Sequence, residues 1–182
     1  MINVKKIDIE RLKNPTALYH LLDPKPEKLD AFADKLLKGY LYFSDEFRDA
    51  EYLRALVYDL YSRRSFNLIY EMGDFKGVIG FIDVVFNHKA DMMLKMWDAS
   101  IWGPDAVGQC RYLIEYIIET FGLTRVGTMT ADSRVVRMAK MVGFTEEGTL
   151  RRSFKWNGKV HDEILLSITR GQEAKNGMLQ GK

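Results

Sequence analysis

The first third of the chain carries apolar side chains mostly at helical spacing. In the stretch that ends at Gly39, leucine and phenylalanine recur every three or four positions, so they would share one face of a helix. Asn14 and Pro15 are typical of a helix start, because asparagine caps helices and proline fits the first turn. The predicted elements here are a strand over residues 4–9, a helix from Asn14-Pro15 with Leu18, Leu21 and Leu22 on one face, and helices over residues 27–38 and 45–63.

After residue 65 the apolar period falls to two, which is typical of a strand with one buried face. Turn residues at 73–77 separate two such runs, and Asn157-Gly158, a strong hairpin signal, separates the last two. Two amphipathic helices lie between them, each closed by a glycine. The predicted elements are strands over residues 66–72, 78–86, 92–101 and 125–130, a helix that begins after Trp102 and ends at Gly122, a helix capped by Asp132-Ser133 and ended by Gly143, and a final hairpin.

This order of elements predicts an α+β, or mixed α/β, fold in which helices cover a largely antiparallel sheet. The chain contains no internal repeat, linker or low-complexity block. We therefore expect a single domain over residues 1–170, followed by a polar C-terminal tail over residues 171–182.

Composition and charge narrow the class of protein. The 182 residues are 47% apolar and 29% charged, which excludes a disordered chain or a disulfide scaffold. The 27 basic and 25 acidic residues leave a net charge of +2, and this balance argues against a nucleic-acid partner. No apolar run is long enough to cross a membrane. The single cysteine, Cys110, and the lack of a charged-then-apolar leader predict a cytoplasmic location.

Two further features have ordinary interpretations. The three histidines, His20, His88 and His161, share no ligand spacing with Cys110, so we expect no metal site. Basic residues surround Trp156 in the final hairpin, and a solvated strand face explains them better than an acidic or nucleic-acid partner. An exposed Trp156 would instead favour a homodimer.

The join at residues 101–109 is the most informative point for function. A strand that runs into a helix leaves several backbone N–H groups unpaired, and together with the helix dipole these groups favour an anion such as a phosphate. Gly103 and Gly108 would let a ligand approach the backbone closely. An ordinary turn between a strand and a helix has the same features, so this join alone does not identify a site.

Several segments of the second half form one combined pattern. They are residues 78–82 (VIGFI), 97–103 (WDASIWG), 121–126 (FGLTRV), 140–151 (KMVGFTEEGTLR) and the Asn157-Gly158 turn with Asp162. In this combination residues 66–170 resemble the GNAT family of acetyl-CoA-dependent N-acetyltransferases, most closely its ribosomal-protein N-terminal acetyltransferase branch. The resemblance implies a splayed, mostly antiparallel sheet with helices on both faces.

The resemblance also implies a chemistry and a set of residues. Acetyl-CoA would be the co-substrate, and a small-molecule or peptide amine, such as a protein N-terminus, would be the acceptor. Asp98 would receive an amine proton through water, and the Ser133 hydroxyl would protonate the thiolate. Both also have simpler roles, Asp98 in a turn and Ser133 as a helix cap. The implied cofactor-binding residues are Ala99, Ser100 and Ile101 at the thioester, and Trp102, Gly103, Pro104, Asp105, Ala106, Val107, Gly108, Ser133 and Arg137.

The diphosphate loop departs from the family pattern. Asp105 stands at the second glycine position and Val107 at a small-residue position, while Pro104 removes one N–H donor. In one interpretation Asp105 points away and the loop backbone still binds coenzyme A. In the other, its carboxylate occupies the anion site, and the protein is a catalytically silent binding or assembly protein with the same fold.

Overall fold

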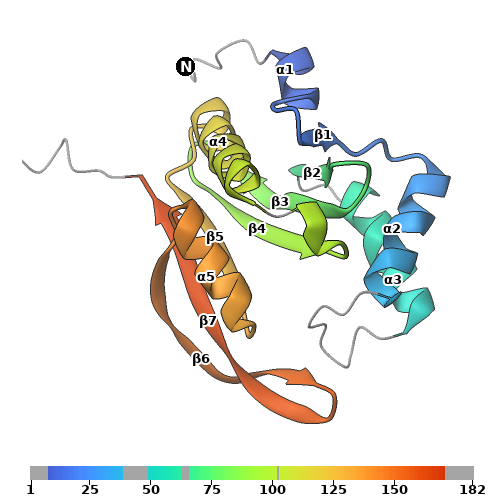
Figure 1. Ribbon diagram of the computed structural model, residues 1–182, viewed down its shortest axis with the longest axis vertical. Coiled ribbons are helices and arrows are strands. Elements are labelled where there is room, and N and C mark those ends of the chain that lie inside the picture. Colours follow the sequence, from blue (N-terminus) through green and yellow to red (C-terminus); the bar gives the residue numbers. More distant parts are fainter. Residues whose placement is uncertain (1–7, 39–48, 63–65, 102, 171–182) are drawn as a thin grey trace, which may run out of the picture.

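The computed structural model describes residues 8–38, 49–62, 66–101 and 103–170. In these residues seven strands form one sheet in the order β1-β2-β3-β4-β5-β7-β6 (Figure 1). Every neighbouring pair is antiparallel except β4 and β5, which are parallel. The strands are β1 (Tyr19–Leu21), β2 (Phe66–Met72), β3 (Gly77–Val85), β4 (Lys89–Met96), β5 (Arg125–Thr130), β6 (Thr145–Trp156) and β7 (Lys159–Thr169).

Helices cover both faces of this sheet, as predicted. The helical elements are α1 (Ile9–Lys13), α2 (Pro26–Lys38), α3 (Ala50–Ser62), the 3₁₀ turn η2 (Ala99–Ile101), α4 (Pro104–Phe121) and α5 (Ser133–Val142). Side chains of a strand alternate between faces. On β2, Ile69 packs with α2 and α3, whereas its neighbour Tyr70 belongs to the larger cluster that α4 and α5 complete. None of the described helices is long and apolar enough to span a bilayer.

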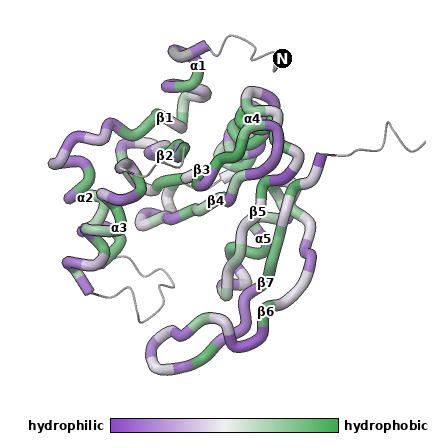
Figure 2. The backbone as a smooth tube through the Cα atoms, turned by 180° about the vertical axis from the view of Figure 1, so that it is seen from behind, coloured by the Kyte–Doolittle hydropathy of each residue, from purple (hydrophilic) through white to green (hydrophobic). Residues whose placement is uncertain are grey.

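The caps that the sequence predicts are in place. Gly122 and Gly143 end α4 and α5 with left-handed backbone, at φ of 64° and 111°. Asp132 caps α5, and its carboxylate accepts a hydrogen bond from the Arg134 backbone N–H at 2.8 Å. Asn157 and Gly158 both have positive φ, as the tight turn between β6 and β7 requires. This hairpin extends beyond the rest of the sheet, with hydrophilic stretches along it (Figure 2).

The N-terminal segment differs from the prediction. Residues 4–7 of the predicted strand lie outside the described residues, and Ile9 begins helix α1. Asn14 ends α1 instead of starting a helix, so the helix predicted from Asn14-Pro15 is wrong. Thr16 Oγ1 accepts hydrogen bonds from two following backbone N–H groups, and the chain then pairs as β1 with the edge of β2. Tyr19 is fully buried there, and this burial outweighs the local helical pattern.

The predicted strand that precedes helix α4 also has different ends. The pattern predicts residues 92–101, but β4 spans Lys89–Met96 and the chain then turns. The Asp98 carboxylate accepts a hydrogen bond from the Ser100 backbone N–H at 2.8 Å, which closes a local turn. Ala99–Ile101 therefore form a 3₁₀ turn in place of extended strand. Residues 45–48 of a predicted helix and the predicted tail over residues 171–182 lie outside the described residues.

Candidate active site

The parallel strands β4 and β5 form a wedge in the middle of the sheet. Their ladder pairs only residues 89–91 with residues 125–127, at the start of both strands. Beyond these pairs, residues 92–96 remain paired with β3 and residues 128–130 with β7, but the two segments do not pair with each other. The edges that face the wedge therefore keep backbone N–H and C=O groups that can bind an extended ligand.

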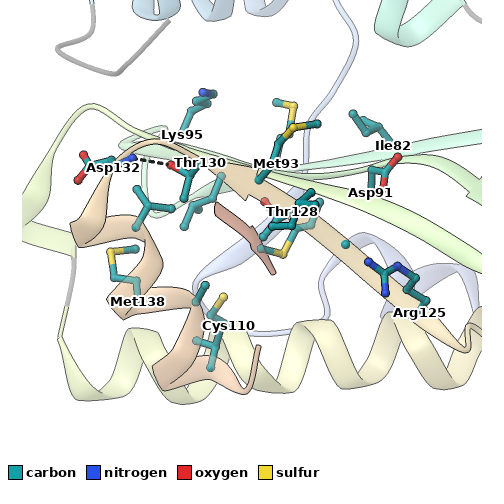
Figure 3. Close-up of a pocket in the computed structure, with 18 residues that line it drawn as sticks. Ile82, Asp91, Met93, Lys95, Cys110, Arg125, Thr128, Thr130, Asp132 and Met138 are labelled. Atoms are coloured by element: carbon teal, nitrogen blue, oxygen red, sulfur yellow. Dashed lines mark hydrogen bonds between the residues drawn. The ribbon is translucent and has the colours of Figure 1, made fainter. Parts of the chain in front are cut away.

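A cavity of about 510 Å³ fills the wedge (Figure 3). Such a volume suits a small-molecule or cofactor site, for which about 300–1,000 Å³ is usual. Apolar side chains dominate the lining, and a few polar groups reach into it. The residues that line the cavity are Ile82 of β3, residues 91–95 of β4, Cys110 of α4, Arg125 and residues 127–130 of β5, Asp132, Val135, Met138, Ala139 and Val142 of α5 with its cap, and Leu165 of β7.

Two helix N-termini lie at the open end of the wedge. Both strands run toward that end, and α4 follows β4 while α5 follows β5. Ligands in α/β sheets bind beyond the carboxyl ends of parallel strands, where helix dipoles and unpaired N–H groups meet. Gly103 is the N-cap of α4 with extended backbone, and an added Cβ would have no atom within 4 Å. An anion can therefore approach the backbone at Gly103 without steric hindrance.

The first turn of α4 bears on the two interpretations of Asp105. Pro104 has no N–H, and the Val107 N–H already donates to the Gly103 carbonyl at 3.1 Å. The N–H groups of Asp105 and Ala106 are thus the ones available to a ligand. Asp105 is exposed, and its carboxylate makes no hydrogen bond to any other described residue. Within the described chain, this carboxylate does not cap the helix.

The predicted catalytic residues lie outside the cavity lining. Asp98 is committed to the turn before α4, with its carboxylate bonded to Ser100 N–H and 4.0 Å from Lys76 Nζ. The hydrogen bonds from Ser100 and the charge of Lys76 hold the pKa of Asp98 below its ordinary value, which weakens it as a proton acceptor. Ser133 is the first residue of α5 and is exposed, while Asp132 provides the cap.

The predicted cofactor-binding residues are grouped around the two helix N-termini. Ala99, Ser100 and Ile101 form the 3₁₀ turn, and Pro104, Asp105, Ala106, Val107 and Gly108 form the first turns of α4. Arg137 is exposed on α5, and Trp102 lies outside the described residues. None of the residues from Ala99 to Gly108 that are described lines the cavity itself. Their binding roles stay predictions.

The residues inside the wedge were not predicted from the sequence. Met93 and Lys95 of β4, Thr128 and Thr130 of β5, and Met138 of α5 all line the cavity. Burial lowers the pKa of Lys95 to about 8, against the opposing effect of the Glu163 carboxylate. A lysine in a strand of methionines and leucine is a signal that could have been used. Its meaning depends on the divergence of β4 from β5, which no local pattern shows.

An ion-pair network holds the strands beside the wedge together. Arg125 of β5 donates two hydrogen bonds to the Glu147 carboxylate of β6, at 2.6 and 2.5 Å. Ser167 of β7 donates to the same carboxylate at 2.5 Å. The hydrogen bonds from Arg125 and Ser167 lower the pKa of Glu147 to about 2.

Among the described residues, no group of three or more histidine, cysteine, aspartate or glutamate side chains is placed to hold a metal ion.

Together, the sheet order, the single parallel pair and the wedge define the class of fold: this chain has the GNAT acetyltransferase fold. The solved structures that are similar to this chain include named acetyltransferases. RimL, the ribosomal L7/L12 alpha-N-protein acetyltransferase, in complex with coenzyme A, superposes with a TM-score of 0.68 at 19% identity over 86% of this chain and 97% of that one.

Two further solved structures are similar. An acetyltransferase from Salmonella typhimurium that modifies the N-terminal serine of ribosomal protein L7/L12 gives a TM-score of 0.69 at 18% identity, over 87% of this chain and 99% of that one. Spermidine N-acetyltransferase from Vibrio cholerae, in complex with coenzyme A and spermine, gives a TM-score of 0.65 at 16% identity. The match covers 85% of this chain and 96% of that one. No protein-family model and no curated protein sequence matches this chain. At these identities the likeness is one of fold.

Proposed function

We propose that this protein is an N-acetyltransferase that moves an acetyl group from acetyl-CoA to a primary amine. The observation that carries the proposal is the open wedge between β4 and β5, with a cavity of about 510 Å³ and two helix N-termini at its mouth. An elongated thioester with a diphosphate at one end fits such a site. Its arm would lie along the unpaired edges of β4 and β5, and the diphosphate would lie at Gly103 and the first N–H groups of α4.

Acetyl-CoA supplies the activated carbonyl, and the chain supplies position and electrostatics. Backbone N–H groups along the wedge orient the thioester and polarise its carbonyl oxygen. Apolar side chains such as Met93, Val135 and Met138 exclude water from the reacting carbon. The acceptor nitrogen then forms a bond to that carbon as the bond to sulfur breaks. A proton must leave the amine and the thiolate must gain one.

The acceptor in this proposal is a small-molecule or peptide amine. Among the similar structures, RimL is named for a ribosomal protein N-terminus, and the Vibrio cholerae enzyme is in complex with spermine. The acceptor would approach from the face that α2 and α3 cover, opposite α4 and α5. We also propose a cytoplasmic location, because the single cysteine, Cys110, is a buried thiol that needs no disulfide partner.

Thermal melting with acetyl-CoA is the first test. A ligand at about 100 times its Kd stabilises the native state by about 2.7 kcal/mol, which should raise the Tm of a chain this long by about 5–10 °C. Release of coenzyme A thiol should then follow on addition of a peptide with an N-terminal serine or of spermine. An unchanged Tm at millimolar acetyl-CoA would contradict the proposal. A raised Tm without transfer to either amine would favour the silent binding protein.

The silent alternative rests on the first turn of α4, and one substitution tests it. Asp105→Asn removes a negative charge next to the proposed diphosphate site, so we expect coenzyme A to bind about three- to fivefold more tightly at low salt. Glu119→Gln removes the same charge from the far end of α4 and should leave the Kd unchanged. Calorimetric titration measures both. Binding that appears only in the Asn variant would mean that Asp105 blocks the natural site.

A further inference from the structure

The reaction proposed above needs a side chain that takes a proton from the amine substrate. This side chain must lie on the side of the wedge from which the amine approaches. A primary amine is mostly protonated at neutral pH, and only its neutral form attacks a carbonyl. Asp98 and Ser133 do not line the cavity, so the group must be sought among the titratable side chains that do. These are Asp91, Lys95, Cys110, Arg125 and Asp132.

Three of these five side chains have environments that do not suit a proton transfer from an amine. Asp132 caps α5 and forms an ion pair with Arg134 at 2.6 Å. Arg125 is bound to Glu147, and a guanidinium does not release its proton in this pH range. Cys110 lies on the α4 side with 1% of its surface exposed, and burial raises the pKa of its thiol to about 11. None of the three is suited to take a proton from an incoming amine.

The two remaining groups differ in their place along β4. Asp91 lies opposite Gly127, in the part of the ladder where β4 and β5 are still paired. Lys95 lies four residues further on, beyond the divergence. In Figure 3 the Lys95 and Met93 side chains point to one side of the sheet, while Cys110 and Met138 lie on the other. Met93 packs against the α2 and α3 cluster, so this is the face from which the proposed function brings the acceptor.

We propose that Lys95, in its neutral form, accepts the proton of the acceptor amine. This role rests on the proposed acetyl transfer. The Lys95 Nζ forms a bond to one proton of the acceptor ammonium, whose own N–H bond breaks. The freed lone pair forms the bond from nitrogen to the carbonyl carbon as the C–S bond breaks. A second N–H proton neutralises the departing thiolate, and Lys95 releases its proton to solvent.

The environment of Lys95 suits this task. Burial lowers its pKa to about 8, so about a tenth of the side chain is neutral at pH 7, compared with a far smaller fraction for an exposed lysine. Glu163 of β7 faces it and raises that pKa in part. Glu163 is half-buried and lies two residues from Leu165, which lines the cavity. Among the described residues that line the cavity, the other charged groups are Asp91, Arg125 and Asp132.

The pH dependence follows from these signs. The fraction of Lys95 in the neutral, active form increases as the pH rises toward about 8. The plot of kcat against pH should therefore have a rising limb with that apparent pKa. Glu163→Gln removes the charge that favours the protonated form. The limb should therefore move to lower pH in this variant. A lysine that only supports the fold would not move the limb when Glu163 is changed.

Substitutions of Lys95 separate proton transfer from charge and packing. Lys95→Met keeps the length and loses the amine, and kcat should fall about a hundredfold or more with an unchanged Kd for acetyl-CoA. Lys95→Arg keeps the positive charge, but a guanidinium stays protonated in this pH range and cannot accept a proton, so its kcat should fall as far. Lys89→Met is the control, since Lys89 is exposed on the same strand in the paired part of the ladder. Its kcat should equal that of the natural protein.

The same assays distinguish the two proposals. Acetyl-CoA binding and transfer to the N-terminal-serine peptide or spermine are measured first with the natural protein. Failure of either would overturn the acetyltransferase proposal and the role of Lys95 with it. Normal activity in the natural protein together with Lys95→Met or Lys95→Arg within about threefold of it would overturn the role of Lys95 alone.

Discussion

Val135→Trp is expected to abolish coenzyme A binding and leave the fold intact. Val135 lies half-buried on α5 and lines the wedge, so an indole at this position would fill the space that the thioester arm needs. We expect the Kd to rise at least about a hundredfold, which corresponds to about 2.7 kcal/mol of binding free energy. Calorimetric titration with coenzyme A measures this change, and the midpoint of thermal unfolding in its absence reports on the fold.

Met141→Trp is the matched control for this substitution. Met141 lies on the same helix, is 53% exposed and does not line the cavity. Its Kd for coenzyme A should equal that of the natural protein. If Val135→Trp and Met141→Trp bind coenzyme A equally well, the wedge is not the binding site, and the proposed function loses the observation on which it depends.

Phe81→Ala is expected to lower the free energy of unfolding by about 3–5 kcal/mol. Phe81 is fully buried in β3, between β2 and β4, and its ring centroid lies 6.5 Å from that of Tyr70 in an edge-to-face arrangement. Removing the ring leaves a cavity beneath α4 in a sheet that cannot collapse to fill it. Because domains are usually stable by only about 5–15 kcal/mol, this loss would be a large part of the total. Urea unfolding monitored by circular dichroism measures it.

A surface position provides the comparison. Leu37 is 41% exposed on α2, and Leu37→Ala should change the free energy of unfolding by less than about 1 kcal/mol. The slope of the unfolding transition should be the same for both variants, since neither changes the fold. A Phe81→Ala protein as stable as Leu37→Ala would mean that β3 is not at the centre of the core.

Local chemistry alone predicts several elements correctly. The apolar stripe of α4, with Leu113, Ile114 and Ile117 fully buried, is visible as a spacing of three and four. Gly122, Gly143 and the Asn157-Gly158 turn are readable because each takes a left-handed backbone that few other residues tolerate. These features depend on residues within a few positions of each other, so no knowledge of distant segments is needed.

Distant partners decide where local prediction goes wrong. The leucines around Tyr19 fit a helix, but the free edge of β2 takes this segment as a strand. The end of β4 depends on the turn at Asp98. This turn lies where the chain leaves the sheet and turns toward α4. The side chains of the wedge belong to four strands and two helices that are far apart in the sequence.

The sequence by itself determined the class of fold, most helix ends and the final hairpin, because these follow from short-range spacing and backbone preference. Only the tertiary structure decided that β4 and β5 separate after three pairs, that Asp98 lies outside the cavity and that Lys95 lies inside it. The physical reason is that the pKa and the access of a side chain depend on which groups surround it in space. Those groups come from segments that folding alone brings together.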